Sequence, residues 1–109
     1  MDSRLFVETT LFTRLIEEIG DNTLLARIQN EILSDPEKGD VIRGTGGVRK
    51  IRVKKPSSGK RGGYRVIYLD TPVKQKTFLL TIYDKRMKID LSEKQKALIK
   101  SLALKLKGE

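Results

Sequence analysis

The chain of 109 residues carries 23 Lys+Arg against 14 Asp+Glu, a formal net charge of +9, and it contains no His, Cys or Trp. A chain of this length builds one hydrophobic core, so we expect a single domain over residues 1–109. The missing cysteine and histidine exclude a disulfide framework, a thiolate nucleophile and the commonest metal ligands, so we expect neither a metal nor a cofactor.

The first forty residues predict a short strand followed by a helical hairpin. Residues 5–7 have the composition of a strand, and either of the two threonines after them is suited to cap a helix over about 11–19. Asp21 or Asn22 is the expected cap of a second helix, which ends before Pro36. The N-terminal segment lacks the basic and long apolar regions of a signal peptide, so we expect a cytoplasmic protein.

The positive charge is concentrated in the middle of the chain. Residues 1–40 carry 4 Lys+Arg and 9 Asp+Glu, whereas residues 41–69 carry nine basic residues and no carboxylate. A solubilising surface usually mixes the two signs, so this block favours a binding site for a polyanion.

The same middle segment predicts three strands in an antiparallel sheet. Apolar and basic residues alternate over 48–55, and strands over 64–69 and 77–83 follow after short connections. The glycine-rich stretch 44–47 leads into a strand and is interpreted as a tight turn, not as a phosphate-binding loop. The predicted fold class is α+β, with the helical hairpin packed on one face of the sheet and the other face, carrying the basic residues, open to water.

A C-terminal helix is predicted from the capping-box pattern at residues 92–95 to about residue 106. Its expected apolar face contains Leu98, Ile99, Leu102 and Leu106. A basic amphipathic helix of this kind can lie on a membrane, but docking on the domain or on a partner is favoured because no large aromatic residue anchors the apolar side.

Three basic side chains of the strand pair are expected to meet. Lys50 and Arg52 lie on one strand face, and Arg65 enters from the next strand, within reach of the same phosphate. Clustered cations repel, and this lowers the pKa of a lysine, so such a site can supply a general base without histidine. Cleavage of RNA by its own 2′-hydroxyl needs a base, cations for the phosphorane charge and an acid, all available from Lys, Arg and Tyr.

Further basic and aromatic residues near these strands are candidates for RNA binding. Tyr64 and Tyr83 can stack on bases, whereas Tyr68 is expected in the core. The remaining candidates, which would hold the RNA backbone, are Arg49, Lys54, Lys60 and Arg61.

Successive blocks of the chain resemble the HigB-type toxins of the RelE/ParE superfamily. The resemblance spans nearly the whole chain and is carried by Asp35-Pro36, Gly39-Asp40-Val41-Ile42, Gly44-Thr45-Gly46-Gly47-Val48-Arg49-Lys50-Ile51-Arg52, Gly59-Lys60-Arg61-Gly62-Gly63-Tyr64-Arg65-Val66-Ile67-Tyr68 and Leu80-Thr81-Ile82-Tyr83-Asp84-Lys85. It implies a compact microbial RNase fold and the ribosome-dependent cleavage of mRNA by a toxin of a type II toxin-antitoxin system.

The resemblance also implies site residues and partners. It places the family's basic residues on Lys50, Arg52 and Arg65, and its basic residue after the last strand on Lys85 or Arg86. The implied partners are the ribosome, mRNA and a cognate antitoxin, commonly a helix-turn-helix protein through which the pair binds operator DNA. Because the superfamily includes gyrase-directed toxins, the alternative functions are a non-catalytic gyrase inhibitor and an RNA-binding module.

Overall fold

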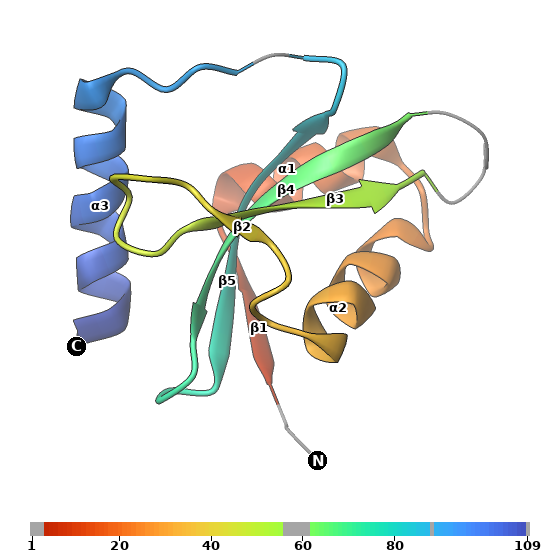
Figure 1. The fold of residues 1–109 in the computed structure, drawn as a ribbon. Coiled ribbons are helices and arrows are strands. Elements are labelled where there is room, and N and C mark those ends of the chain that lie inside the picture. Colours follow the sequence, from red (N-terminus) through yellow and green to blue (C-terminus); the bar gives the residue numbers. More distant parts are fainter. Residues whose placement is uncertain (1–3, 56–61, 88, 109) are drawn as a thin grey trace.

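The computed structural model describes residues 4–55, 62–87 and 89–108, which form a mixed α+β fold (Figure 1). In chain order the elements are β1 (Leu5–Glu8), α1 (Thr10–Ile19), α2 (Leu24–Ser34), β2 (Asp40–Val41), β3 (Arg49–Lys54), β4 (Gly63–Thr71), β5 (Lys76–Asp84) and α3 (Glu93–Gly108). The predicted fold class and the three predicted strands of the meander are confirmed.

The sheet has five strands in the order β1-β5-β4-β3-β2. The pairs β2–β3, β3–β4 and β4–β5 are antiparallel, as expected for short connections. The edge strand β1 instead runs parallel to β5, with Leu5 opposite Lys76 and Glu8 opposite Leu79. The two-residue strand β2 forms the other edge of the sheet.

The helices α1 and α2 cover one face of the sheet, the helical face, as predicted. Phe12 of α1 and Leu24, Ile28 and Ile32 of α2 are fully buried against the apolar residues that β3, β4 and β5 turn to this face. Thr9 caps α1, because its hydroxyl accepts a hydrogen bond from the Phe12 amide at 3.0 Å.

The start of α2 differs from the prediction. Its N-cap is Thr23 and not Asp21 or Asn22. The carboxylate of Asp21 accepts hydrogen bonds from the amide and the hydroxyl of Thr23, both at 2.9 Å, so it closes a turn before the helix begins.

The opposite face of the sheet is not fully open to water, which corrects the prediction. The helix α3 covers the half of this face where Val48 and Leu69 are buried against Ala103 (Figure 1). The helix begins with the predicted capping box, since the Gln95 amide donates to the Ser92 hydroxyl at 3.1 Å and the Gln95 side chain accepts from the Ser92 amide at 2.9 Å.

The predicted apolar face of α3 is correct only in part. Ile99 and Leu106 pack on the sheet, but Leu98 and Leu102 are 65% and 43% exposed. The helix turns Ala103 inward because the glycine-rich loop 44–47 approaches it closely, and a Cβ atom added to Gly46 would lie 3.5 Å from the Cβ of Ala103.

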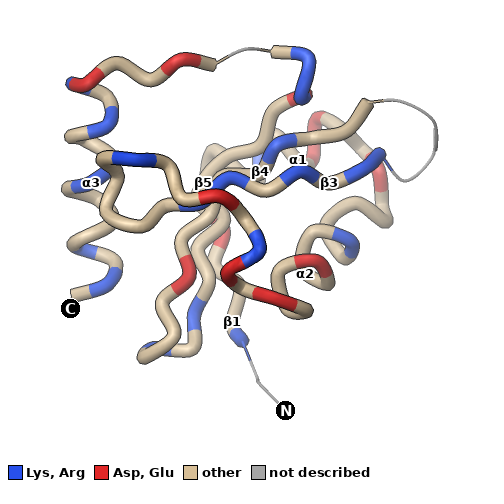
Figure 2. The backbone as a smooth tube through the Cα atoms, viewed as in Figure 1, with Lys and Arg blue, Asp and Glu red and all other residues tan. Residues whose placement is uncertain are grey.

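Charge divides the molecule as the sequence predicted. Figure 2 shows basic positions along β3 and the adjoining part of β4, whereas acidic positions lie on α1, on α2 and on the segment that leads to β2. The uncovered half of the sheet is therefore the positive side of the molecule.

Candidate nucleic-acid interface

Strand register brings the central basic residues into one row across the sheet. Arg52 of β3 lies directly opposite Arg65 of β4, and Arg65 lies opposite Tyr83 of β5. Cβ atoms of such neighbours are about 4.5–5.5 Å apart, so both guanidinium groups can reach one phosphate. The sequence predicted that Arg65 joins this group, and the register shows how it does so.

Two further rows lie on either side of this one, on the same face. Lys50 is opposite Ile67, and Lys54 is opposite Gly63. The Lys85 amide donates to the Gly63 carbonyl at 3.0 Å, which carries the pairing one residue beyond β5. Because side chains alternate along a strand, this register places Lys85 on the same face as Tyr83. We call these six residues the basic face: Lys50, Arg52, Lys54, Arg65, Tyr83 and Lys85.

The basic face keeps its charges available. Arg52 and Lys54 are exposed, while Lys50, Arg65 and Tyr83 are half-buried. Within the described part of the chain, none of its cations forms an ion pair with a carboxylate. Although Asp40 lies opposite Lys50 across the β2–β3 pair, no carboxylate of the described residues is paired with these cations, so they can bind an anion.

A cavity of about 320 Å³ opens beside the basic face, between the sheet and the start of α3. Lys50, Thr81 and Tyr83 line it from the sheet, and Asp90 and Lys96 line it from the C-terminal segment. The rest of its wall is apolar: Ile42, Ile67, Ile89, Leu91 and Ile99. Apolar walls with a few polar groups suit a flat aromatic ring. The sequence prediction missed this cavity, because it left this face of the sheet uncovered.

Three candidate residues are not brought to the basic face. The ring of Tyr64 packs against the core on the helical face, with the Lys55 ammonium 5.3 Å from its centre. The Arg49 guanidinium donates to the carbonyls of Glu37 and Gly39 at 3.0 and 2.7 Å, so it anchors the loop before β2. Arg86 pairs with Asp84. Two further candidates, Lys60 and Arg61, lie outside the described residues.

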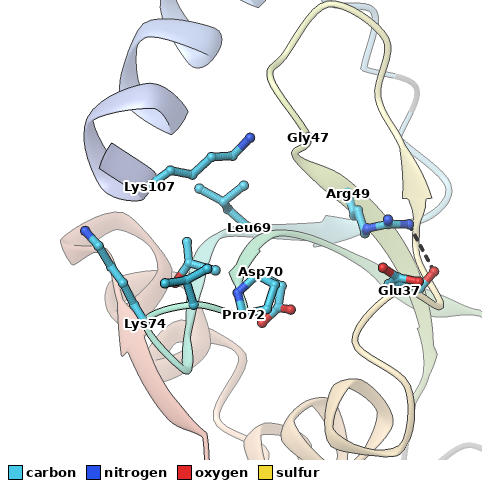
Figure 3. A pocket seen from close by; sticks show the side chains of 10 residues that line it. Glu37, Gly47, Arg49, Leu69, Asp70, Pro72, Lys74 and Lys107 are labelled. Carbon is cyan, nitrogen blue, oxygen red and sulfur yellow. Dashed lines mark hydrogen bonds between the residues drawn. The ribbon is translucent and has the colours of Figure 1, made fainter. Parts of the chain in front are cut away.

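A second hollow, of about 340 Å³, lies near the C-terminal end of α3 (Figure 3). Its three cations already have partners, because Arg49 holds carbonyls, Lys74 donates to the Leu106 carbonyl at 2.8 Å and Lys107 donates to the Gly46 carbonyl. Glu37 adds a carboxylate to its wall, whereas the Asp70 carboxylate is paired with Arg4. These contacts fasten α3 to the loops beside it, and they make the hollow a poor anion site.

The described residues contain no group of three His, Cys, Asp or Glu that could hold a metal ion. Of the helices in this part of the chain, none has both the length and the apolar composition needed to cross a bilayer. The side chains of the basic face are those of lysine, arginine and tyrosine, which can act in proton transfer and in charge stabilisation.

The chain is similar to a known protein family and to several solved structures. Residues 4–108 match the model of a family described as the RelE toxin of the RelE/RelB toxin-antitoxin system. A mutant of the E. coli toxin RelE in the free state is 20% identical, with a TM-score of 0.55 over 95% of this chain and 97% of that one. The isolated E. coli RelE toxin is 21% identical, with a TM-score of 0.54 over 92% and 99%.

A chain of the intact E. coli RelBE toxin-antitoxin complex is also similar, at 23% identity and a TM-score of 0.54 over 73% of this chain and 94% of that one. At such identities the three structures establish a shared fold. The match to the family model covers nearly the whole chain, so it establishes family membership in addition to the fold.

Proposed function

The chain belongs to the RelE family of toxins, the mRNA interferases of type II toxin-antitoxin systems, and we propose that it cuts mRNA on the ribosome with the residues of its basic face. The observation that carries this proposal is the pairing of Arg52 with Arg65, with Lys50 two residues away on the same face. A passive RNA binder needs positive charge but not three cations that converge on one phosphate.

In the proposed reaction, the 2′-hydroxyl of the message attacks the adjacent phosphorus and the 5′-oxygen leaves. Lys50 is the candidate base that removes the 2′-proton, and Arg52 and Arg65 stabilise the added negative charge of the phosphorane. Lys85 is the candidate acid for the departing oxygen, because the register places it on the basic face while Arg86 pairs with Asp84.

The remaining residues of the basic face would bind the message. Lys54 would contact its backbone, and Tyr83 can stack on a base next to the 320 Å³ cavity. The assignment of Lys60 and Arg61 to RNA binding stays a prediction, as does the HigB subtype.

An antitoxin is the partner of a toxin of this family. We propose that it is a helix-turn-helix protein, that operator DNA is bound only through it, and that the toxin meets ribosomes and mRNA in the cytoplasm. The tract of nine basic residues within 41–69 would approach ribosomal RNA together with the message.

A cell-free translation reaction with primer extension on the message tests the cleavage. Arg65→Ala removes charge-assisted hydrogen bonds to the phosphate, worth about 1.5–3 kcal/mol, so the cleavage rate should fall roughly 10- to 150-fold. Arg14→Ala is the matched control, because it removes the same charge from an exposed position on α1 and should cleave like the wild type. Equal cleavage by the Arg65→Ala variant and the wild type would overturn the assignment.

The alternative functions predict different products in the same extract. A gyrase inhibitor would leave the message intact and produce DNA breaks, and a passive RNA binder would produce neither break. Binding of a single-stranded RNA should weaken with salt, with a slope of log K against log salt of about −0.7 for each phosphate neutralised.

A further inference from the structure

At the corner where β3 and β5 end, one carboxylate holds two basic side chains. Asp84 Oδ1 accepts from the Arg86 amide at 2.9 Å and from its Nε at 3.0 Å. Asp84 Oδ2 accepts from Arg86 Nη2 at 3.1 Å and lies 3.1 Å from the Lys55 ammonium. The carboxylate is thus bound by the two-pronged edge of a guanidinium and by an ammonium.

This corner is separate from the basic face. Asp84 lies opposite Tyr64, whose ring packs on the helical side of the sheet, and Lys55 lies over that ring. Each of the two cations nevertheless follows directly after a residue of the basic face, Lys55 after Lys54 and Arg86 after Lys85. An RNA strand that leaves the basic face over this end of the sheet therefore meets the corner next.

The groups that hold Asp84 are those that bind phosphate in proteins. The planar fork of arginine matches two oxygens of a phosphate as it matches those of a carboxylate, and a lysine adds a point charge. The Arg86 side chain is 78% exposed, so an incoming anion can reach it without any movement of the core. The hydrogen bonds from Arg86 and then from Lys55 hold the pKa of Asp84 far below its usual range, so the carboxylate stays charged at physiological pH.

We propose that Lys55 and Arg86 form a second phosphate site for RNA, which Asp84 occupies in the free protein and which a phosphate takes over when RNA binds. The proposal rests on the proposed function in one respect, namely that RNA is the ligand of the basic face. Asp84 acts as a built-in competitor: it lowers the affinity for RNA because it occupies both cations. Because the Arg86 side chain lies in water, its ion pair with Asp84 is weak and a phosphate can replace the carboxylate.

Binding of a fluorescent single-stranded RNA oligonucleotide to the purified protein, measured by anisotropy over a range of salt concentrations, tests the exchange. The Asp84→Asn variant should bind about two- to fivefold more tightly, the equilibrium factor of one exposed ion pair, with an unchanged salt slope. Arg86→Ala should weaken binding and reduce the salt slope by about 0.7, because one phosphate loses its cation.

Matched variants separate this competition from a general effect of charge. Glu17→Gln removes an equal charge from an exposed position on α1 and should leave the affinity unchanged. Asp84→Glu keeps the competitor and should bind less tightly than Asp84→Asn. In the double variant Asp84→Asn/Arg86→Ala the gain in affinity should disappear.

Three results would overturn the proposal: wild-type affinity in Asp84→Asn, an equal gain in Glu17→Gln, or a wild-type salt slope in Arg86→Ala. The last test does not depend on the folding of the Asp84 variant, since the Arg86 side chain is exposed. If the wild type cleaves mRNA but Arg86→Ala keeps the wild-type salt slope, this site is refuted and the proposed function stands. If Arg86→Ala shows the expected smaller slope but the wild type does not cleave mRNA, this site stands and the proposed function is refuted.

Discussion

Removal of the Tyr68 hydroxyl tests how the loop before β2 is held in place. Tyr68 is fully buried, its hydroxyl donates to the Pro36 carbonyl at 2.9 Å, and it accepts from the Gly39 amide at 3.0 Å. Burial raises the pKa of Tyr68, so the neutral hydroxyl is the form that makes both bonds. Gly39 is buried as well, so water does not reach its amide. Tyr68→Phe therefore leaves the Gly39 amide without a hydrogen-bond acceptor.

An unsatisfied buried polar group costs about 1–3 kcal/mol, so we expect Tyr68→Phe to lower the free energy of unfolding by that amount. For a domain of this size 1 kcal/mol corresponds to roughly 4 °C in Tm, so the expected loss is about 4–12 °C. Thermal unfolding followed by circular dichroism measures it. Tyr83→Phe, at a half-buried position on the basic face, is the control and should stay within about 0.5 kcal/mol of the wild type. A Tyr68→Phe variant as stable as this control would refute the reasoning.

Three further changes probe other contacts. Gly39→Ala would place a Cβ atom 2.9 Å from the ring and hydroxyl of Tyr68, so we expect a loss of about 1–3 kcal/mol in urea unfolding, and wild-type stability would contradict the close approach. Arg4 pairs with Asp70 at 3.4 Å, and both side chains are about nine-tenths buried, so Arg4→Ala should cost about 3 kcal/mol; a loss below 1 kcal/mol would show that the pair is dispensable. The pKa of Asp84 is lowered on folding, so its stabilising effect is present above its ordinary value of 3.8 and is lost as pH falls toward the folded-state value. Between pH 7 and pH 3, Asp84→Asn should therefore lose less Tm than the wild type, and equal losses would contradict this.

The sequence predicted the composition of the basic face because a strand alternates with a period of two. The apolar residues Ile51 and Val53 must face the core, which sends Lys50, Arg52 and Lys54 to the other side. The partner of Arg52 could not be assigned in the same way, since the register with β4 depends on how the whole sheet pairs.

Several of the errors concern contacts between distant segments. Leucine is more hydrophobic than alanine, so Leu98 and Leu102 were expected to be buried. The glycine-rich loop 44–47 instead lies so close to α3 that only the small side chain of Ala103 fits against it. The parallel pairing of β1 with β5 joins segments about seventy residues apart, and no local pattern reports it. The ion pair of Asp84 with Lys55 was missed because Lys55 follows β3, which β4 separates from β5 in the sheet.

The pairing of β1 with β5 also determines the order in which the chain can fold during its synthesis. The strand β1 is synthesised first, but it cannot pair until β5 has been synthesised, because Leu5 pairs with Lys76 and Glu8 with Leu79. Such long-range closure is slow, and until it occurs the apolar sides of α1 and α2 have only part of the surface that finally buries them. We expect the β3–β4–β5 meander to form before β1 joins it. Because Tyr83 and Lys85 belong to the last third of the chain, the basic face is completed only after most of the chain has been made.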